Sequence, residues 1–167
     1  MKDLNRYVDI YKEQLAKGDI QEAYVGLVKY VTRLRTTLSK TLSEKYSFGN
    51  LFQGYMDYTY FYYSNDFLRK RKLKMGLVLN HSKIQFEIWL LGQTIPIQEQ
   101  YWQYLKTTKW NIGRTSKPRY SILETVLIDN PNFNDLEKLS KQIEDKLVLV
   151  TGEITQDIKT SKLNKQT

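Results

Sequence analysis

The sequence predicts an α+β protein in which a mainly antiparallel sheet of about four strands packs under long helices, in the order α-α-β-β-β-α-β-α. Two observations predict this fold class. Apolar stripes at helical spacing occupy both ends of the 167-residue chain, and apolar residues alternate with polar ones in the middle. Neither a repeat nor a linker rich in proline and glycine divides the chain, so we expect residues 1–158 to form one domain.

The first third of the chain carries two helical patterns separated by a glycine. The first pattern, over residues 2–17, consists of Leu4, Val8, Tyr11 and Leu15. Gly18 ends it, because glycine commonly follows a helix in the left-handed conformation. Asp19 and Glu22 then resemble a capping box. An apolar stripe continues for more than six turns over residues 20–42 and predicts one long helix.

Three strands are expected in the middle. Residues 57–63 are rich in aromatic side chains that favour strands, and residues 73–79 and 84–90 alternate between apolar and polar. We expect the last two to form a hairpin, with His81-Ser82 as a two-residue loop or with a four-residue loop in the same register. This register places on one side the apolar pairs Leu79 with Ile84, Leu77 with Phe86, Met75 with Ile88 and Leu73 with Leu90.

The remaining elements follow from helix signals and a β-rich segment. Pro96 suits the first turn of a helix, and residues 107–119 are typical of an exposed loop. Residues 122–128 predict a further strand. Asn134 and Glu137 suggest another capping box before a last amphipathic helix over residues 136–158, and residues 159–167 are expected to be a frayed tail.

The net charge of +8 is concentrated in the centre of this tyrosine-rich, basic chain. Residues 51–128 carry +6, against +3 before them and −1 after them. A basic patch attracts polyanions at long range, and it also serves simply as a solvated surface. The basic side chains are Arg69, Lys70, Arg71, Lys72, Lys74, Lys106, Lys109, Arg114, Lys117 and Arg119.

The sequence lacks the residues that several classes of enzyme and metal site require. The absence of cysteine removes disulfides and zinc–thiolate sites, and the common phosphate-loop, dinucleotide, serine-hydrolase and zinc-peptidase motifs are missing. The single histidine, His81, is expected to be a turn residue. We therefore assign no catalytic residue, no metal ligand and no cofactor. The apolar stretches are too short to cross a membrane and no signal peptide is visible, so we expect a cytoplasmic protein.

The candidate binding residues lie on two expected strands and on the basic segment between them. Tyr58, Tyr60 and Tyr62 share one face of the first strand, and the hairpin presents Glu87 and Trp89 on its polar side. We expect Lys74 to lie across from Trp89, able to stack on its ring and to pair with Glu87. Aromatic rings beside basic groups are typical of single-stranded nucleic acid sites, although cross-strand packing produces the same pattern. The full set is Lys74, Glu87, Trp89, Tyr58, Tyr60, Tyr62, Arg69 and Arg71.

The expected order of elements also matches the core of the PD-(D/E)xK nucleases, whose third core strand carries Glu-x-Lys. Here that strand has Glu87-Ile88-Trp89, with tryptophan in place of the lysine, and the second strand has no acid. The nearest acid, Asp57, lies one strand earlier. An intact site of that family is absent, and fold analogy alone supports a metal-dependent hydrolase or a degenerate nuclease-like fold that uses Asp57 and Glu87.

Six short segments resemble a family of short, uncharacterised bacterial proteins that is filed as a domain of unknown function. The likeness spans roughly residues 1–155 and implies a bacterial cytoplasmic protein, with no activity or site residue to transfer. The segments are residues 11–15, 17–20, 52–61, 72–74, 80–81 and 86–93.

Our leading hypothesis is a non-enzymatic binding module for an anionic partner, either nucleic acid or an acidic protein. The alternatives are the metal-dependent hydrolase and a homo-oligomeric structural protein whose exposed tyrosines form an interface.

Overall fold

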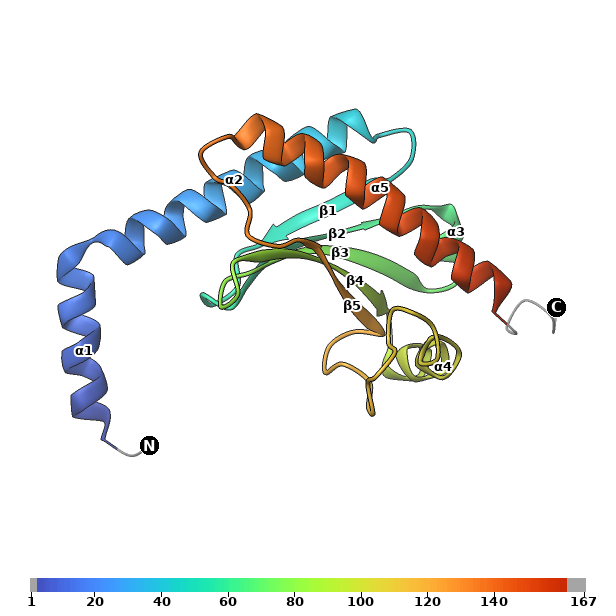
Figure 1. The fold of residues 1–167 in the computed structure, drawn as a ribbon, viewed down its shortest axis with the longest axis horizontal. Coiled ribbons are helices and arrows are strands. Elements are labelled where there is room, and N and C mark those ends of the chain that lie inside the picture. The colour runs from blue at the N-terminus through green and yellow to red at the C-terminus, as the bar shows by residue number, and fades with distance from the viewer. Residues whose placement is uncertain (1–2, 162–167) are drawn as a thin grey trace.

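The structure is a computed structural model that describes residues 3–161, with a five-stranded antiparallel sheet under two long helices (Figure 1). The α+β fold and the predicted order are confirmed, with β1 and the short helix α3 as additional elements. The helices are α1 (Leu4–Lys17), α2 (Asp19–Thr41), α3 (Asp66–Lys70), α4 (Ile95–Leu105) and α5 (Leu136–Thr160). The strands are β1 (Ser47–Phe52), β2 (Tyr58–Ser64), β3 (Leu73–Asn80), β4 (Gln85–Gly92) and β5 (Leu123–Ile128).

Each strand pairs with its neighbour in sequence, so the sheet has the order β1-β2-β3-β4-β5. The sequence analysis did not predict β1, because its residues do not alternate strictly. The register between β1 and β2 shifts between Phe48 and Leu51, where Gly49 and Asn50 interrupt the pairing. Such a bulge breaks the two-residue period on which strand prediction depends.

The β3–β4 hairpin is confirmed, but its predicted register is wrong by two residues. Leu79 pairs with Phe86, Leu77 with Ile88 and Met75 with Leu90. A four-residue turn, residues 81–84, joins the strands, and Ile84 ends it with φ 48° instead of starting β4. A shift of two residues leaves every side chain on the face that was predicted, so the alternation could not distinguish the two registers.

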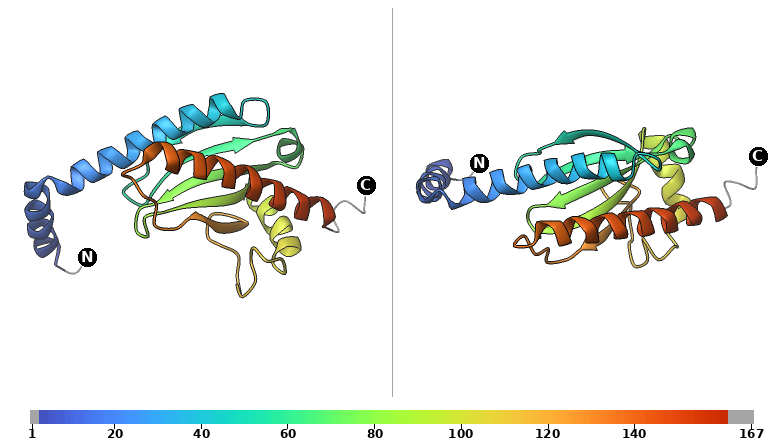
Figure 2. Two further views of the ribbon diagram at one scale, coloured as in Figure 1. Left: turned by 45° about the horizontal axis from the view of Figure 1, so that its top comes forward. Right: turned by 90° about the horizontal axis from the view of Figure 1, so that it is seen from above.

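Helices α2 and α5 lie side by side over one face of the sheet, which we call the covered face (Figure 2). Their apolar stripes pack on side chains such as Phe61, Leu77 and Ile88, which are fully buried. Tyr63 also points to this face, where its hydroxyl lies 2.7 Å from that of Thr151 on α5. The buried residues of these two helices are Val28, Tyr30, Val31, Leu34 and Leu38 on α2, with Leu139, Ile143, Leu147, Thr151, Ile154 and Ile158 on α5.

Neither predicted capping box forms, and each helix begins one residue away from the predicted cap. Gly18, at φ 80°, is both the C-cap of α1 and the N-cap of α2. Asp19 therefore lies inside the first turn of α2. The left-handed conformation that glycine tolerates allows the sharp bend between these helices. At α5 the cap is Asp135, whose carboxylate accepts a hydrogen bond of 3.1 Å from the backbone N–H of Lys138.

Helix α1 projects from the rest of the chain beyond this bend, as Figure 1 shows. None of its residues is buried, and large apolar side chains including Tyr7 and Tyr11 are more than half exposed. This exposure is compatible with self-association. The structure of a single chain does not test the predicted homo-oligomer, which stays a prediction.

Helix α5 continues to Thr160, so Lys159 and Thr160 are helical although we expected them in the frayed tail. Residues 162–167 of that predicted tail lie outside the described residues. Within residues 3–161, no helix combines the length and the apolar character that crossing a membrane requires.

Candidate binding site

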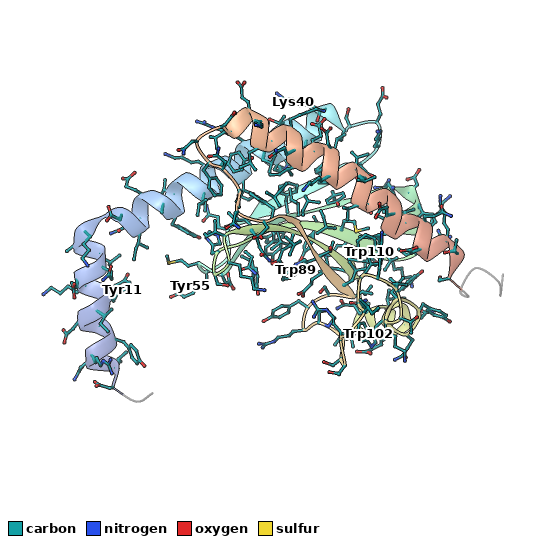
Figure 3. The ribbon with its side chains drawn as sticks, in the orientation of Figure 1. Tyr11, Lys40, Tyr55, Trp89, Trp102 and Trp110 are labelled. Carbon is teal, nitrogen blue, oxygen red and sulfur yellow. The ribbon has the colours of Figure 1, made fainter. Side chains whose placement is uncertain are left out.

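The second face of the sheet, which we call the open face, carries a separate aromatic cluster. Tyr58, Tyr60 and Tyr62 point to it from β2, because successive strand residues alternate between faces and Phe61 and Tyr63 point to the helices. Their neighbours in the cluster are Val78 on β3 with Trp89 and Leu91 on β4. Figure 3 shows Trp89 on the side of the sheet opposite α2 and α5. The predicted common face of the three tyrosines is confirmed.

This cluster forms the floor of a pocket of about 330 Å³. A pocket of this volume is at the small end of the range for ligand sites. One wall is Tyr120, which comes from the long loop before β5 and is half exposed. The complete lining is Gly54, Asp57, Tyr58, Tyr60, Tyr62, Val78, Trp89, Leu91 and Tyr120.

Two tyrosines of the floor form a cluster with Phe52 of β1, which does not line the pocket. Phe52 stacks on Tyr60 with ring centres 5.0 Å apart and an angle of 15°, Tyr60 contacts Tyr62 at 5.3 Å, and Phe52 contacts Tyr62 at 5.6 Å. Tyr58 meets Trp89 edge-on at 5.1 Å. Burial raises the pKa of Tyr62 to about 12, so its hydroxyl is neutral at physiological pH. The floor is therefore a partly exposed, uncharged aromatic surface.

Glu87 is a buried carboxylate that fixes the position of Trp89. One of its oxygens accepts a hydrogen bond of 2.7 Å from the indole N–H, and the other accepts from the side-chain amides of Asn80 and Gln85. Only 5% of Glu87 is exposed. A buried polar group must be hydrogen-bonded to be tolerated, and here three neutral donors meet that need. Glu87 therefore lies beside Trp89 on the open face and holds its ring in place, but does not line the pocket.

Lys74 does not occupy the place we expected. In the true register it lies opposite Leu91, and Gly76 lies opposite Trp89, so the predicted pairing of Lys74 with Trp89 and Glu87 is wrong. Its ammonium instead lies 3.5 Å from the ring centre of Tyr62. Partial burial lowers the pKa of Lys74. The lysine thus marks one end of the aromatic floor.

Arg69 and Arg71 do not line the pocket. Arg69 forms an ion pair of 2.6 Å with Asp66 and donates to the hydroxyl of Ser47, and Arg71 lies 3.7 Å from the ring centre of Phe67. They belong to α3 and the turn before β3, at the end of the sheet where Lys74 also lies. These predicted residues form a basic rim beyond the floor.

Asp57 lies at the opposite end of the pocket. Its Oδ1 accepts hydrogen bonds from the backbone N–H groups of Tyr55 at 2.8 Å and Tyr58 at 2.7 Å. These bonds hold the pKa of Asp57 below its usual value, so the carboxylate is ionised at neutral pH. Burial, together with the nearby charges of Glu124, Glu87 and Asp57, raises the pKa of Tyr58. This end of the pocket is therefore acidic.

Asp57 and Glu87, the two acids of the hydrolase hypothesis, both belong to the open side of the sheet. Backbone and side-chain donors already occupy Oδ1 of Asp57 and both oxygens of Glu87. Among residues 3–161, no group of three or more histidine, aspartate and glutamate side chains is placed to hold a metal ion.

His81 lies in the β3–β4 turn, as expected, and it also connects that turn to other elements. Its Nε2 lies 2.8 Å from the hydroxyl of Thr59, and its ring contacts that of Tyr24 on α2. Burial lowers the pKa of His81, an effect that the nearby charge of Asp57 opposes.

The family comparison gives one match. Residues 4–158 match the family model described as "Domain of unknown function (DUF7000)". Neither a curated protein nor a solved structure matches the chain.

Proposed function

The chain belongs to this family, and we propose that it is a non-enzymatic binding module that takes an anionic partner, single-stranded nucleic acid, on the open face of its sheet. The observation that carries the proposal is a cluster of three partly exposed rings, Phe52, Tyr60 and Tyr62, with the ammonium of Lys74 over the ring of Tyr62. Unstacked bases bind to exposed aromatic rings by stacking, and cations beside the rings contact phosphates.

Positive charge lies at the margins of the floor, as this mode of binding requires. The ammonium of Lys74 lies over the ring of Tyr62, and Arg69 lines a hollow that Tyr62 and Lys74 also line. On the wall, the guanidinium of Arg119 lies 5.0 Å from the ring centre of Tyr120. An acidic protein, the other anionic partner that we predicted, would contact the same cations but would leave the aromatic floor unused.

The test is a titration of a fluorescently labelled single-stranded oligonucleotide, followed by anisotropy at low and at raised salt. Binding should weaken steeply with salt, because released counterions drive phosphate binding. Tyr60→Ala should weaken binding about tenfold or more, since one base stack contributes about 1–3 kcal/mol. Lys74→Ala should lower the slope of log affinity against log salt by about 1.

Two residues of α1 provide matched controls. Tyr11 is exposed and far from the pocket in sequence and in Figure 3, and Lys12 beside it is exposed too. Tyr11→Ala and Lys12→Ala should leave both affinity and salt slope unchanged. No binding at low ionic strength, or an equal loss in Tyr11→Ala and Tyr60→Ala, would contradict the proposal.

A further inference from the structure

The open face is electrically asymmetric along β2. Asp57 precedes Tyr58, the first tyrosine that β2 presents to this face, and the ammonium of Lys74 lies on Tyr62, the last one. At roughly 3.3 Å per strand residue, Tyr58 and Tyr62 are separated by about 13 Å. The two ends of a nucleotide bound on this floor require different protein groups. The phosphate requires a cation, and the edge of the base requires hydrogen-bonding groups.

The acidic end offers one carboxylate oxygen to a ligand. Glu87 is buried and fully engaged, and Glu124 accepts from the hydroxyl of Ser121 and lies 3.8 Å from Arg114. The backbone N–H groups of Tyr55 and Tyr58 donate to Oδ1 of Asp57, and its own backbone N–H also interacts with the carboxylate. Within residues 3–161, no other residue donates to Oδ2. Asp57 also lines the pocket. It is therefore the acid that is free to contact a bound base.

We propose that the pocket selects guanine, with the base stacked on the tyrosines, its N–H edge turned toward Asp57 and its phosphate toward Lys74. This inference rests on the proposed function. An ionised carboxylate accepts hydrogen bonds and donates none. Guanine alone presents two adjacent donors, the ring N1–H and the exocyclic amine, on its Watson–Crick edge. Adenine and cytosine place an acceptor beside their single amino group, and thymine places its N–H between two carbonyl oxygens.

The experiment compares labelled decamers of thymidine that carry one central dG, dI, dA or dC, or none. A single guanine avoids the four-stranded structures that guanine runs form. The dG decamer should bind at least about tenfold more tightly than the thymidine, dA and dC decamers, as a matched pair of hydrogen bonds to a base does. Inosine keeps N1–H but lacks the amine, so its decamer should bind with intermediate affinity.

Asp57→Asn is the decisive variant, because its amide oxygen keeps an acceptor for the N–H groups of Tyr55 and Tyr58 while the charge is removed. The guanine preference should fall to about twofold or less, while the thymidine decamer binds at least as tightly as before. Asp9→Asn, at an exposed acid of α1, is the matched control and should retain the full preference. Thermal unfolding of each variant establishes that it is folded.

The outcomes separate this inference from the proposed function. Decamers that bind with equal affinity whatever the central base would overturn the guanine selection and leave nucleic acid binding intact. If no decamer binds, both proposals fail. An aromatic pocket with an acidic end also suits an organic cation. Tetramethylammonium that perturbs the fluorescence of Trp89 in the wild type but not in Asp57→Asn, without any decamer binding, would assign the pocket to that ligand class and overturn both.

Discussion

The two faces of the sheet come from the same five strands but differ in what covers them. The covered face presents residues such as Phe61, Leu77 and Ile88 to two helices, and these side chains are fully buried. The open face presents Tyr60 and Tyr62, which belong to a separate cluster and stay partly exposed. Neighbouring positions on one strand therefore differ in burial: the residues of the covered face stabilise the fold, and we propose that those of the open face contact a partner. Tyrosine suits the second role, because its ring is apolar and its hydroxyl tolerates water.

Truncating neighbouring residues of β2 gives the strongest test of whether the two faces contribute differently to stability. Phe61→Ala should lower the free energy of unfolding by about 3–5 kcal/mol, because it removes a fully buried ring and leaves a cavity. Tyr60→Ala should cost less than half as much, since its ring is only partly buried. Urea unfolding of both variants measures the difference. Equal losses would mean that the open face is a structural layer rather than a binding surface.

Removal of the Glu87 carboxylate should have the next largest effect. Glu87→Ala leaves the N–H groups of Asn80, Gln85 and Trp89 without their acceptor, and each unsatisfied buried group is costly. We expect a loss of about 1–3 kcal/mol and a change in the emission of Trp89. Glu99→Ala, at an exposed acid of α4, is the matched control and should change neither. A Trp89 emission that stays the same would show that Glu87 does not position this ring.

The smallest expected effect concerns the hairpin tip, where His81 joins Thr59 and Tyr24. Burial lowers the pKa of His81 below the ordinary histidine value of about 6.5, so the unfolded chain binds a proton more readily than the folded one. Stability should be fully present above about pH 7 and decline as the pH falls below the unfolded pKa of about 6.5.

His81→Gln tests this cleanly, because His81 is the single histidine of the chain. Urea unfolding at about pH 7 and about pH 5.5, a window above the ordinary carboxylate range, isolates the imidazole. The variant should lose less stability than the wild type over this interval. Identical pH dependence in the two proteins would assign the decline to other groups.

The sequence predicted the positions of those residues whose face follows from the period of a helix or a strand. The aromatic composition predicted the strand, and the two-residue period of any strand then placed Tyr58, Tyr60 and Tyr62 on one face. The apolar stripes of α2 and α5 predicted which sides of these helices are buried. The hairpin register was missed because a shift by two residues preserves both faces, and with it the contact of Lys74 was misplaced.

The pocket itself combines strand residues with loop residues that no periodicity governs. Tyr120 reaches the site from a long loop, and Asp57 enters it through a turn held by its own carboxylate. Asp57 stood out in the sequence only as an acid for metal chemistry. Arg69 and Arg71 were grouped with the site by sequence proximity, but α3 carries them to the rim. No pattern in the sequence indicated that Tyr120 and Asp57 would meet at one pocket.

The order of the strands in the sheet also affects how the chain can fold during its synthesis. The strands from β1 to β4 are joined by short connections, and such local pairings close with little loss of chain entropy, which favours rapid folding. Of the two helices over the covered face, however, α2 precedes the strands in sequence and α5 follows them. During synthesis β1 to β4 can therefore pair before α5 has been made, and until then the covered face lacks the packing of that helix.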